Sequence, residues 1–94
     1  MAKIGKLDVL IVLSELNNEL GEGDKRPSRE EITQYLRESE ELSYEEFRKA
    51  CEKPLGDFLL ELMEQDYIKQ EWSKAAFRFQ LTSKGSAYLK RQTG

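Results

Sequence analysis

The side chains of this sequence that could do chemistry are mostly carboxylates and cations. The chain has 18 Asp and Glu, 15 Lys and Arg, one cysteine and no histidine. With Cys51 alone and no histidine, it lacks the Ser-His and Cys-His pairs that activate a nucleophile and nearly all of the usual zinc ligands. A single cysteine also excludes an intramolecular disulfide. We therefore expect neither histidine-based catalysis nor a classical zinc site.

Adjacent carboxylates are the next candidates for acid-base chemistry. They form the pairs Glu30-Glu31, Glu40-Glu41 and Glu45-Glu46. Neighbouring residues of a helix diverge by about 100°, so such pairs do not form an acid-base dyad. Gly21-Glu22-Gly23 lacks the third glycine and the preceding strand of a dinucleotide-binding loop. We expect the protein not to be an enzyme and to need no cofactor or metal.

Lys and Arg side chains that could bind phosphate are the remaining candidates. Such side chains contact nucleic-acid backbones without reading the base sequence. The net charge is −7 over residues 38–66 and +5 over residues 67–94. The basic end permits binding to nucleic acid, whereas the acidic segment argues against a uniformly basic surface. The candidate phosphate-binding residues are Arg29, Arg48, Lys49, Lys53, Lys69, Lys74, Arg78 and Lys84.

Amphipathic helices must position most of these side chains, because apolar residues recur at steps of three and four. Gly21 can end the first helix. Ser28 and Ser43 each precede a glutamate by three residues, which is a capping box and predicts two further helix starts. Pro54 predicts a break and suits the first turn of a new helix. The expected helices cover residues 6–20, 28–38, 43–53 and 54–66.

A β-hairpin is expected next, because Tyr67-Ile68 and residues 77–81 are rich in β-forming residues and flank the polar Ser73-Lys74 turn. Thr82 or Ser83 can cap a last helix. The helices, with the hairpin along one edge, would form a single domain over residues 1–94. The expected core residues are Leu10, Leu13, Ile32, Leu36, Leu55, Leu59, Leu62, Ile68 and Phe79.

This layout resembles a winged helix-turn-helix domain over most of the chain. Ile32-Thr33-Gln34-Tyr35-Leu36 is similar to the family's second helix, and residues 55–62 followed by Asp66-Tyr67-Ile68 are similar to its third. Leu81-Thr82-Ser83-Lys84-Gly85 resembles the segment that closes the wing in MarR-like and PadR-like regulators. The resemblance implies a mostly helical α+β winged helix-turn-helix fold, with a three-helix core, an extra inserted helix, a β-hairpin wing and a C-terminal helix.

Two features depart from the family pattern. The helix expected after Ser43 is inserted before the helix that begins at Pro54, which takes the place of the recognition helix. The outward positions of that helix hold Gly56, Asp57, Leu60, Glu61 and Glu64, whose carboxylates would repel phosphates. Alternatively, the segment from Ser43 is the first half of one long kinked recognition helix. Arg48, Lys49 and Lys53 would then be the candidates for DNA contacts.

The leading hypothesis is a DNA-binding protein of the winged-helix transcription-regulator type. It would grip the phosphates of double-stranded DNA through the basic wing and through Arg29, Arg48, Lys49 or Lys53. The alternative is a winged-helix module that binds another protein through the acidic segment 38–66 and does not bind DNA. The acidic helix favours the alternative, whereas the resemblance in fold favours DNA.

Four further expectations concern assembly, location and the residues Trp72 and Cys51. A domain this small buries a limited share of its own surface, so we expect a homodimer. Trp72 beside the wing could stack on a base, anchor such a dimer or cover the open side of the hairpin, and we favour the last. The longest apolar run, residues 9–13, is too short to span a membrane, and we expect a cytoplasmic protein. Cys51 is expected to be buried one turn beyond Phe47.

Overall fold

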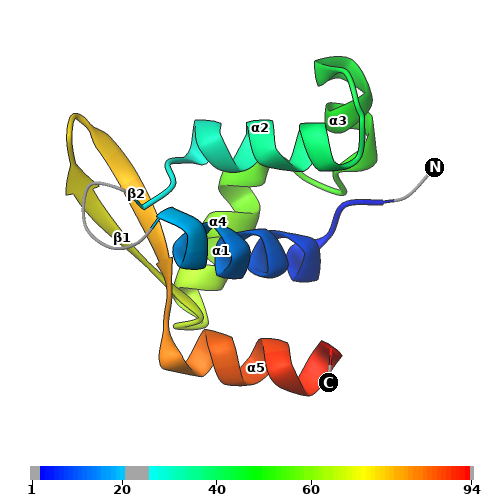
Figure 1. Cartoon of the computed structure of the whole chain (residues 1–94). Helices are drawn as coiled ribbons and strands as arrows, with labels where there is room; N and C mark the ends of the chain where they lie inside the picture. Colours follow the sequence, from blue (N-terminus) through cyan, green and yellow to red (C-terminus); the bar gives the residue numbers. More distant parts are fainter. Residues whose placement is uncertain (1–2, 21–25, 94) are drawn as a thin grey trace.

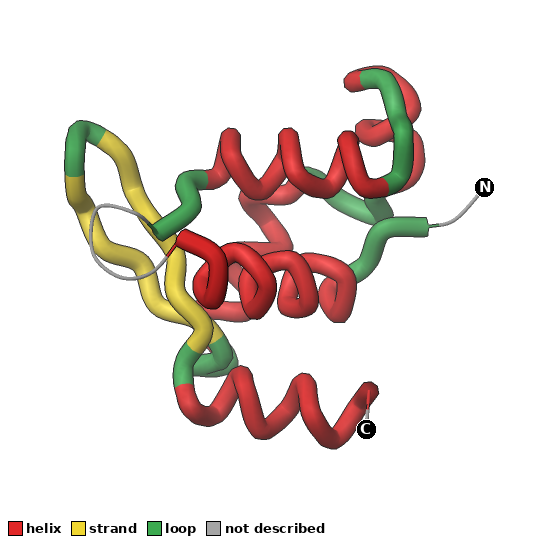
Figure 2. Tube along the Cα trace, in the orientation of Figure 1, coloured by secondary structure: helices red, strands yellow, loops and turns green. Residues whose placement is uncertain are grey.

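The computed structural model describes residues 3–20 and 26–93, and they form a small, mostly helical α+β domain. Helices α1, α2 and α4 pack together, the hairpin lies along one side of them, and α5 lies on the opposite side of α1 from α2 (Figures 1 and 2). In chain order the elements are α1 (Lys6–Leu20), α2 (Arg29–Ser39), α3 (Tyr44–Ala50), α4 (Leu55–Glu64), β1 (Ile68–Ser73), β2 (Ala76–Leu81) and α5 (Ser83–Thr93).

Both predicted capping boxes are present. The Ser28 hydroxyl accepts a hydrogen bond from the Glu31 N–H, and the Glu31 carboxylate accepts one from the Ser28 N–H. Ser43 and Glu46 repeat the arrangement at the start of α3. The bond from the Ser43 backbone lowers the pKa of the Glu46 carboxyl. Local side-chain chemistry therefore sets where α2 and α3 begin.

The helical structure is interrupted between α3 and α4, as Pro54 predicts. Cys51 is extended, with φ −74° and ψ 129°, and Pro54 is the N-cap of α4. The extended segment is held by Ile4, whose N–H donates to the Ala50 carbonyl over 2.9 Å. The alternative of one long kinked helix is therefore wrong. Helix α4 also ends earlier than predicted, at Glu64, because Asp66 turns the chain with φ 63°.

The hairpin forms where predicted, but its turn is displaced by one residue. The turn residues are Lys74 and Ala75, with φ 51° and 59°, and Ser73 still pairs with Ala76. Two successive left-handed residues form the turn type that matches the twist of a two-residue hairpin. The predicted Ser73-Lys74 turn is therefore wrong, because residue preference alone placed it.

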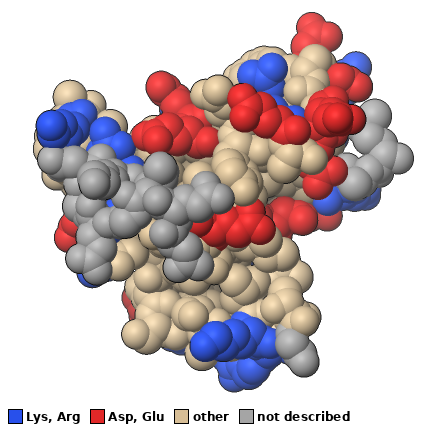
Figure 3. All heavy atoms as spheres, viewed as in Figure 1, with Lys and Arg blue, Asp and Glu red and all other residues tan. Residues whose placement is uncertain are grey.

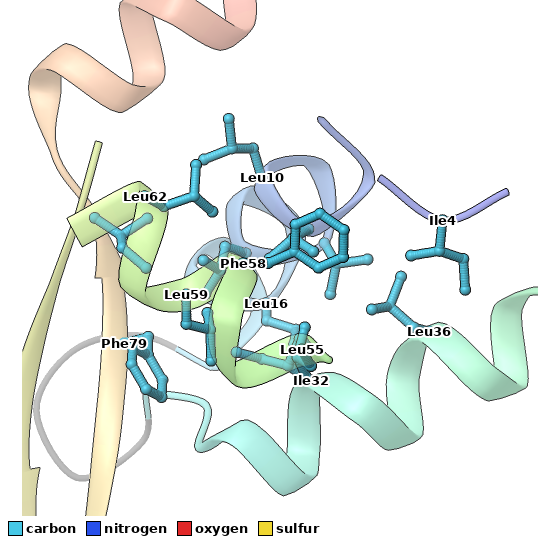
Figure 4. Close-up of a cluster of buried hydrophobic side chains, with 14 of the residues drawn as sticks. Ile4, Leu10, Leu16, Ile32, Leu36, Leu55, Phe58, Leu59, Leu62 and Phe79 are labelled. Carbon is cyan, nitrogen blue, oxygen red and sulfur yellow. The ribbon is translucent and has the colours of Figure 1, made fainter. Parts of the chain in front are cut away.

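One hydrophobic cluster joins the helices to the base of the hairpin, and all nine predicted core residues are buried in it. Figure 4 shows Phe58 and Leu62 of α4 beside Leu10 of α1, and Phe79 of β2 beside Leu59. Sequence reasoning did not place Ile4 in the core, although it is only 3% exposed. Ile4 precedes α1 and so lies outside any helical pattern.

Helix α5 approaches the rest of the domain very closely at Gly85. A Cβ atom at this position would lie 2.0 Å from the carbonyl oxygen of Tyr67. The Thr82 hydroxyl accepts a hydrogen bond from the Gly85 N–H over 3.0 Å and so caps the helix, as predicted. The rings of Tyr67 and Tyr88 stack with their centroids 4.5 Å apart. Together these contacts fix the first turns of α5.

Candidate interaction surface

A cleft of about 640 Å³ lies between the start of α2, the outward side of α4 and the hairpin. Leu59 and Phe79 line it from the core and are almost fully buried. Leu60, Met63 and Phe77 line its more open part. Leu60 is 56% exposed and Phe77 is 50% exposed, so large apolar side chains meet solvent here. We call this the α4-hairpin cleft.

Trp72 extends the apolar surface beyond the α4-hairpin cleft. The register places it opposite Phe77, and the two rings meet edge to face with centroids 4.9 Å apart. Trp72 nevertheless remains 64% exposed. Its expected role of covering the hairpin is limited to this contact, because most of the indole faces solvent.

The outward side of α4 is acidic where it borders the cleft. Gly56 lines the cleft beside Asp57, which is exposed, and Glu64 is exposed one turn beyond Leu60. Four of the five predicted outward residues thus lie on this side or at its edge. Cations, which a phosphate-binding helix would need, are missing from these positions.

Glu61 differs from its predicted outward position because it is half-buried and paired. Its carboxylate accepts a hydrogen bond from Lys53 and lies 3.9 Å from the Lys6 ammonium. The bond from Lys53 holds the pKa of the Glu61 carboxyl below its ordinary value. The Lys53 ammonium also lies 5.2 Å from the centre of the Phe58 ring. Lys53 therefore has internal partners in this structure.

Arg78, one of the predicted phosphate contacts on the hairpin, is also engaged within the domain. Its side chain is only 14% exposed. The guanidinium donates to the carbonyls of Ser73 and Arg26 over 3.0 and 2.9 Å, and to the Glu31 carboxylate over 3.2 Å. These bonds join β2 to the chain before α2 and to the first turn of α2. Arg78 thus attaches the hairpin to the start of α2 and to the chain before it.

The other predicted cations are exposed but dispersed. Lys69 and Lys74 lie on the hairpin, and Arg48 and Lys49 lie on α3. Lys84 on α5 is exposed, with its ammonium 5.6 Å from the centre of the Tyr67 ring. Figure 3 shows one face of the molecule, where Lys and Arg gather at the hairpin and at the end of α5, and Asp and Glu lie over α1 and α2.

A second, wider cleft of about 1160 Å³ lies between α2 and the segment from α3 to the start of α4. It brings together the predicted cations Arg29, Arg48 and Lys53. Arg37 also lines this cleft, and four glutamates there balance the four cations: Glu30, Glu38, Glu41 and Glu52. The cleft is therefore not a concentrated phosphate site.

Cys51 lines the second cleft and is half-buried, so its expected burial is only partial. Burial raises the pKa of its thiol, which disfavours the reactive thiolate. Across residues 3–20 and 26–93, no three histidine, cysteine or acidic side chains are grouped to hold a metal ion. None of the helices in those ranges is both long and apolar enough to cross a membrane.

Sequence reasoning identified Leu60 as outward-facing but missed the α4-hairpin cleft. The available signal was the alternation along the strands, which puts Gln70, Trp72, Phe77 and Phe79 on one face of the hairpin. That this face meets α4 depends on tertiary packing. Comparison with protein-family models, curated proteins and solved structures finds no match to this chain.

Proposed function

We propose that the chain is a winged-helix protein-interaction module whose α4-hairpin cleft binds an apolar segment of a partner protein. The observation that carries this proposal is the pair of half-exposed side chains, Leu60 and Phe77, at a cleft floored by the core. Exposed apolar side chains gathered around a hollow favour an interaction site over ordinary surface. A cytoplasmic location is part of the same proposal.

The winged-helix assignment is supported by the order of elements and by the third segment that joins the hairpin. Ser28, between α1 and α2, forms an isolated antiparallel bridge with Arg78 of β2. The Phe79 N–H donates to the Pro27 carbonyl over 2.9 Å. The hairpin is thereby attached to the helices along β2, as a wing beside the helix that precedes it.

The chemistry of the partner follows from the charges beside the cleft. Among the described residues that line the cleft, the carboxylates of Glu30 and Asp57 outnumber the single cation, Arg29, and Glu64 is exposed one turn beyond Leu60. Carboxylates in this position favour Lys or Arg in the bound segment and disfavour phosphate. The expected ligand is therefore a peptide with two or three apolar side chains flanked by basic residues.

Peptide selection on the immobilised protein tests this function. We expect enriched peptides to combine apolar and basic residues, and their affinity to fall at least about tenfold in Leu60→Ser, since a truncated anchor typically costs more than about 1 kcal/mol. Tyr44→Ser is the matched control, because Tyr44 is 55% exposed but lies on α3, outside this cleft. Binding that responds equally to both substitutions would contradict the proposal, as would failure to enrich any such peptide.

DNA binding remains a second candidate, supported by the exposed Lys69 and Lys74 on the hairpin. A duplex titrated at several salt concentrations should then show log affinity falling by about 0.9 per phosphate neutralised. Replacing both lysines by alanine should reduce that slope by roughly 1–2, and Asp57→Gln should tighten binding by removing repulsion. No complex at low salt would exclude this candidate and leave the protein-binding proposal standing.

A further inference from the structure

The hairpin has one outer edge whose backbone groups point away from its partner strand. In a two-residue hairpin the flanking pair, here Ser73 and Ala76, is hydrogen-bonded, and hydrogen-bonded pairs alternate with pairs whose backbone N–H and C=O groups point outward. On β1 the outward residues are Ile68, Gln70 and Trp72. No hydrogen bond to the outward groups of Gln70 or Trp72 occurs among the described residues. Figure 4 shows β1 on the outer side of β2.

The sequence of this edge is complementary to itself when two copies run antiparallel. With Gln70 opposite Gln70 of a second copy, Lys69 lies opposite Glu71, and Ile68 lies opposite Trp72. The register is compatible with the backbone, because all three outward residues then meet outward residues. Two opposite-charge pairs therefore form on one face of the joined sheet, and such cross-strand pairs are stabilising. On the other face Ile68 is only 2% exposed and packs in the core of its own copy, so its side chain is not available to Trp72 of the second copy.

The charged side chains that such pairing needs are accessible. Lys69 is exposed, and none of the described residues forms an ion pair with it. Glu71 has 54% of its side chain exposed and uses Oε2 for its 2.8 Å bond with Arg26, which leaves Oε1 for a second cation. Trp72 is 64% exposed at the end of the same strand.

We propose that the chain forms a homodimer by antiparallel pairing of β1 with β1 of a second copy, centred on Gln70. A continuous four-stranded sheet results, because each copy contributes a hairpin joined along its free edge. A two-fold axis is the natural symmetry of antiparallel edge pairing and presents the same patch on both copies. Gln70, at the centre of this pairing, also lines the α4-hairpin cleft, so the dimer interface adjoins the cleft of each copy.

Sedimentation equilibrium of the full chain tests the dimer and its register. Pairing over one short edge gives a small interface, so dissociation is expected in the range of roughly 1 µM to 1 mM. Lys69→Glu places carboxylates opposite each other at both ends and should weaken the dimer at least about tenfold. Glu71→Lys should do the same with cations. The double variant Lys69→Glu/Glu71→Lys restores opposite charges and should recover the dimer.

Mixing the two single variants provides the strictest control. Positions 69 and 71 both carry carboxylates in the Lys69→Glu chain and both carry cations in the Glu71→Lys chain. The mixed dimer should therefore form at concentrations where neither variant pairs alone. A merely structural effect of either substitution would not be rescued by mixing. Lys84→Glu, an equal change of charge on α5, should leave self-association unaltered.

Disulfide trapping tests the centre of the interface. Residues directly opposite in a hydrogen-bonded antiparallel pair have Cα atoms about 5.5 Å apart, which a disulfide can bridge. In a Cys51→Ser background, Gln70→Cys should cross-link on mild oxidation, and Lys84→Cys should not. A chain that is monomeric at about 1 mM would overturn the dimer, as would a dimer insensitive to Lys69→Glu. Selected peptides that still bind such a monomer would leave the proposed cleft function intact.

Discussion

The outer edges of the two hairpin strands differ in whether their backbone groups have hydrogen-bond partners. The outer edge of β2 is sealed, because Phe79 donates to the Pro27 carbonyl and the Leu81 N–H donates to the Asn17 side chain over 2.9 Å. The corresponding edge of β1 has no such partners among the described residues at Gln70 and Trp72. The hairpin is therefore attached along one strand and exposed along the other.

Charged side chains follow the same division. Arg78 on β2 and Lys69 on β1 both belong to the basic C-terminal part, but Arg78 is engaged in internal hydrogen bonds while Lys69 is exposed. Two cations of the same sequence region therefore differ in role: Arg78 attaches its strand to the domain, whereas Lys69 is part of the accessible surface. The division predicts that substitutions at the buried or bonded positions of β2 affect folding, and that substitutions at the exposed positions of the hairpin affect binding.

The largest contrast is expected between the two phenylalanines of β2. Phe79 is 4% exposed and Phe77 is 50% exposed. Phe79→Ala should lower the free energy of unfolding by about 3–5 kcal/mol, because it leaves a cavity in the core. Phe77→Ala should lower it by less than about 1.5 kcal/mol while weakening peptide binding. Urea denaturation measures the free energy of unfolding of both variants. Equal losses would contradict the difference between the buried and the exposed position of β2.

Arg78→Ala should have the next largest effect. It removes a cation that bonds two carbonyls and Glu31 from a largely buried position, at a cost of about 2 kcal/mol. Lys69→Ala is the matched change on β1 and should alter the free energy of unfolding by less than about 0.5 kcal/mol. The same denaturation experiment checks both. If Arg78→Ala proved neutral, its internal bonds would not hold the hairpin in place.

Asn17→Ala removes hydrogen bonds at the outer edge of β2 and should lower the free energy of unfolding by about 1 kcal/mol. The Asn17 amide accepts from the Leu81 N–H and donates to the Phe79 carbonyl over 3.4 Å. Amide hydrogen exchange at Leu81 should quicken accordingly. Exchange at the outward Gln70 amide should be fast in dilute wild-type protein and slow at concentrations where the proposed dimer forms. Slow exchange at Gln70 in the monomer would show that its edge is covered.

The smallest effect is expected at Glu61, the paired carboxylate of α4, and concerns the pH dependence of stability. The pKa of Glu61 is lowered by its bond from Lys53, so the pair stabilises the folded state above the ordinary pKa. That contribution is lost as the pH falls below about 4.5 and through the lowered value. Glu61→Gln should therefore make stability less dependent on acid pH than in the wild type. Thermal melts of the variant and the wild type from acid to neutral pH make this comparison.

The local elements of the fold were predictable from the sequence because local chemistry determines them. Ser28 and Ser43 cap their helices through residues three positions away, and Pro54 breaks the chain through its own ring. The predicted core followed from apolar periodicity. The hairpin turn was misplaced by one residue, since several polar residues could occupy it.

The interaction surface was less predictable because its contacts are distant in sequence. Arg78 reaches Arg26 and Glu31, which are 52 and 47 positions away, so its charge looked available for phosphate. Glu61 was likewise expected to face outward. Its pairing with Lys6 of α1 could not be predicted, because it depends on how the two helices pack. Leu60 and Phe77 had to be brought together by packing before they could define a cleft.

The close approach at Gly85 has a consequence for the evolution of this chain. No side chain fits there unless the carbonyl of Tyr67 moves, and moving it would shift the start of β1 together with the docking of α5. Drift in related sequences should therefore be least at this position. Lys69 and Glu71 should change only as a pair if they meet across two copies. A set of diverged sequences would thus record, without any experiment on the protein, which contacts selection has maintained.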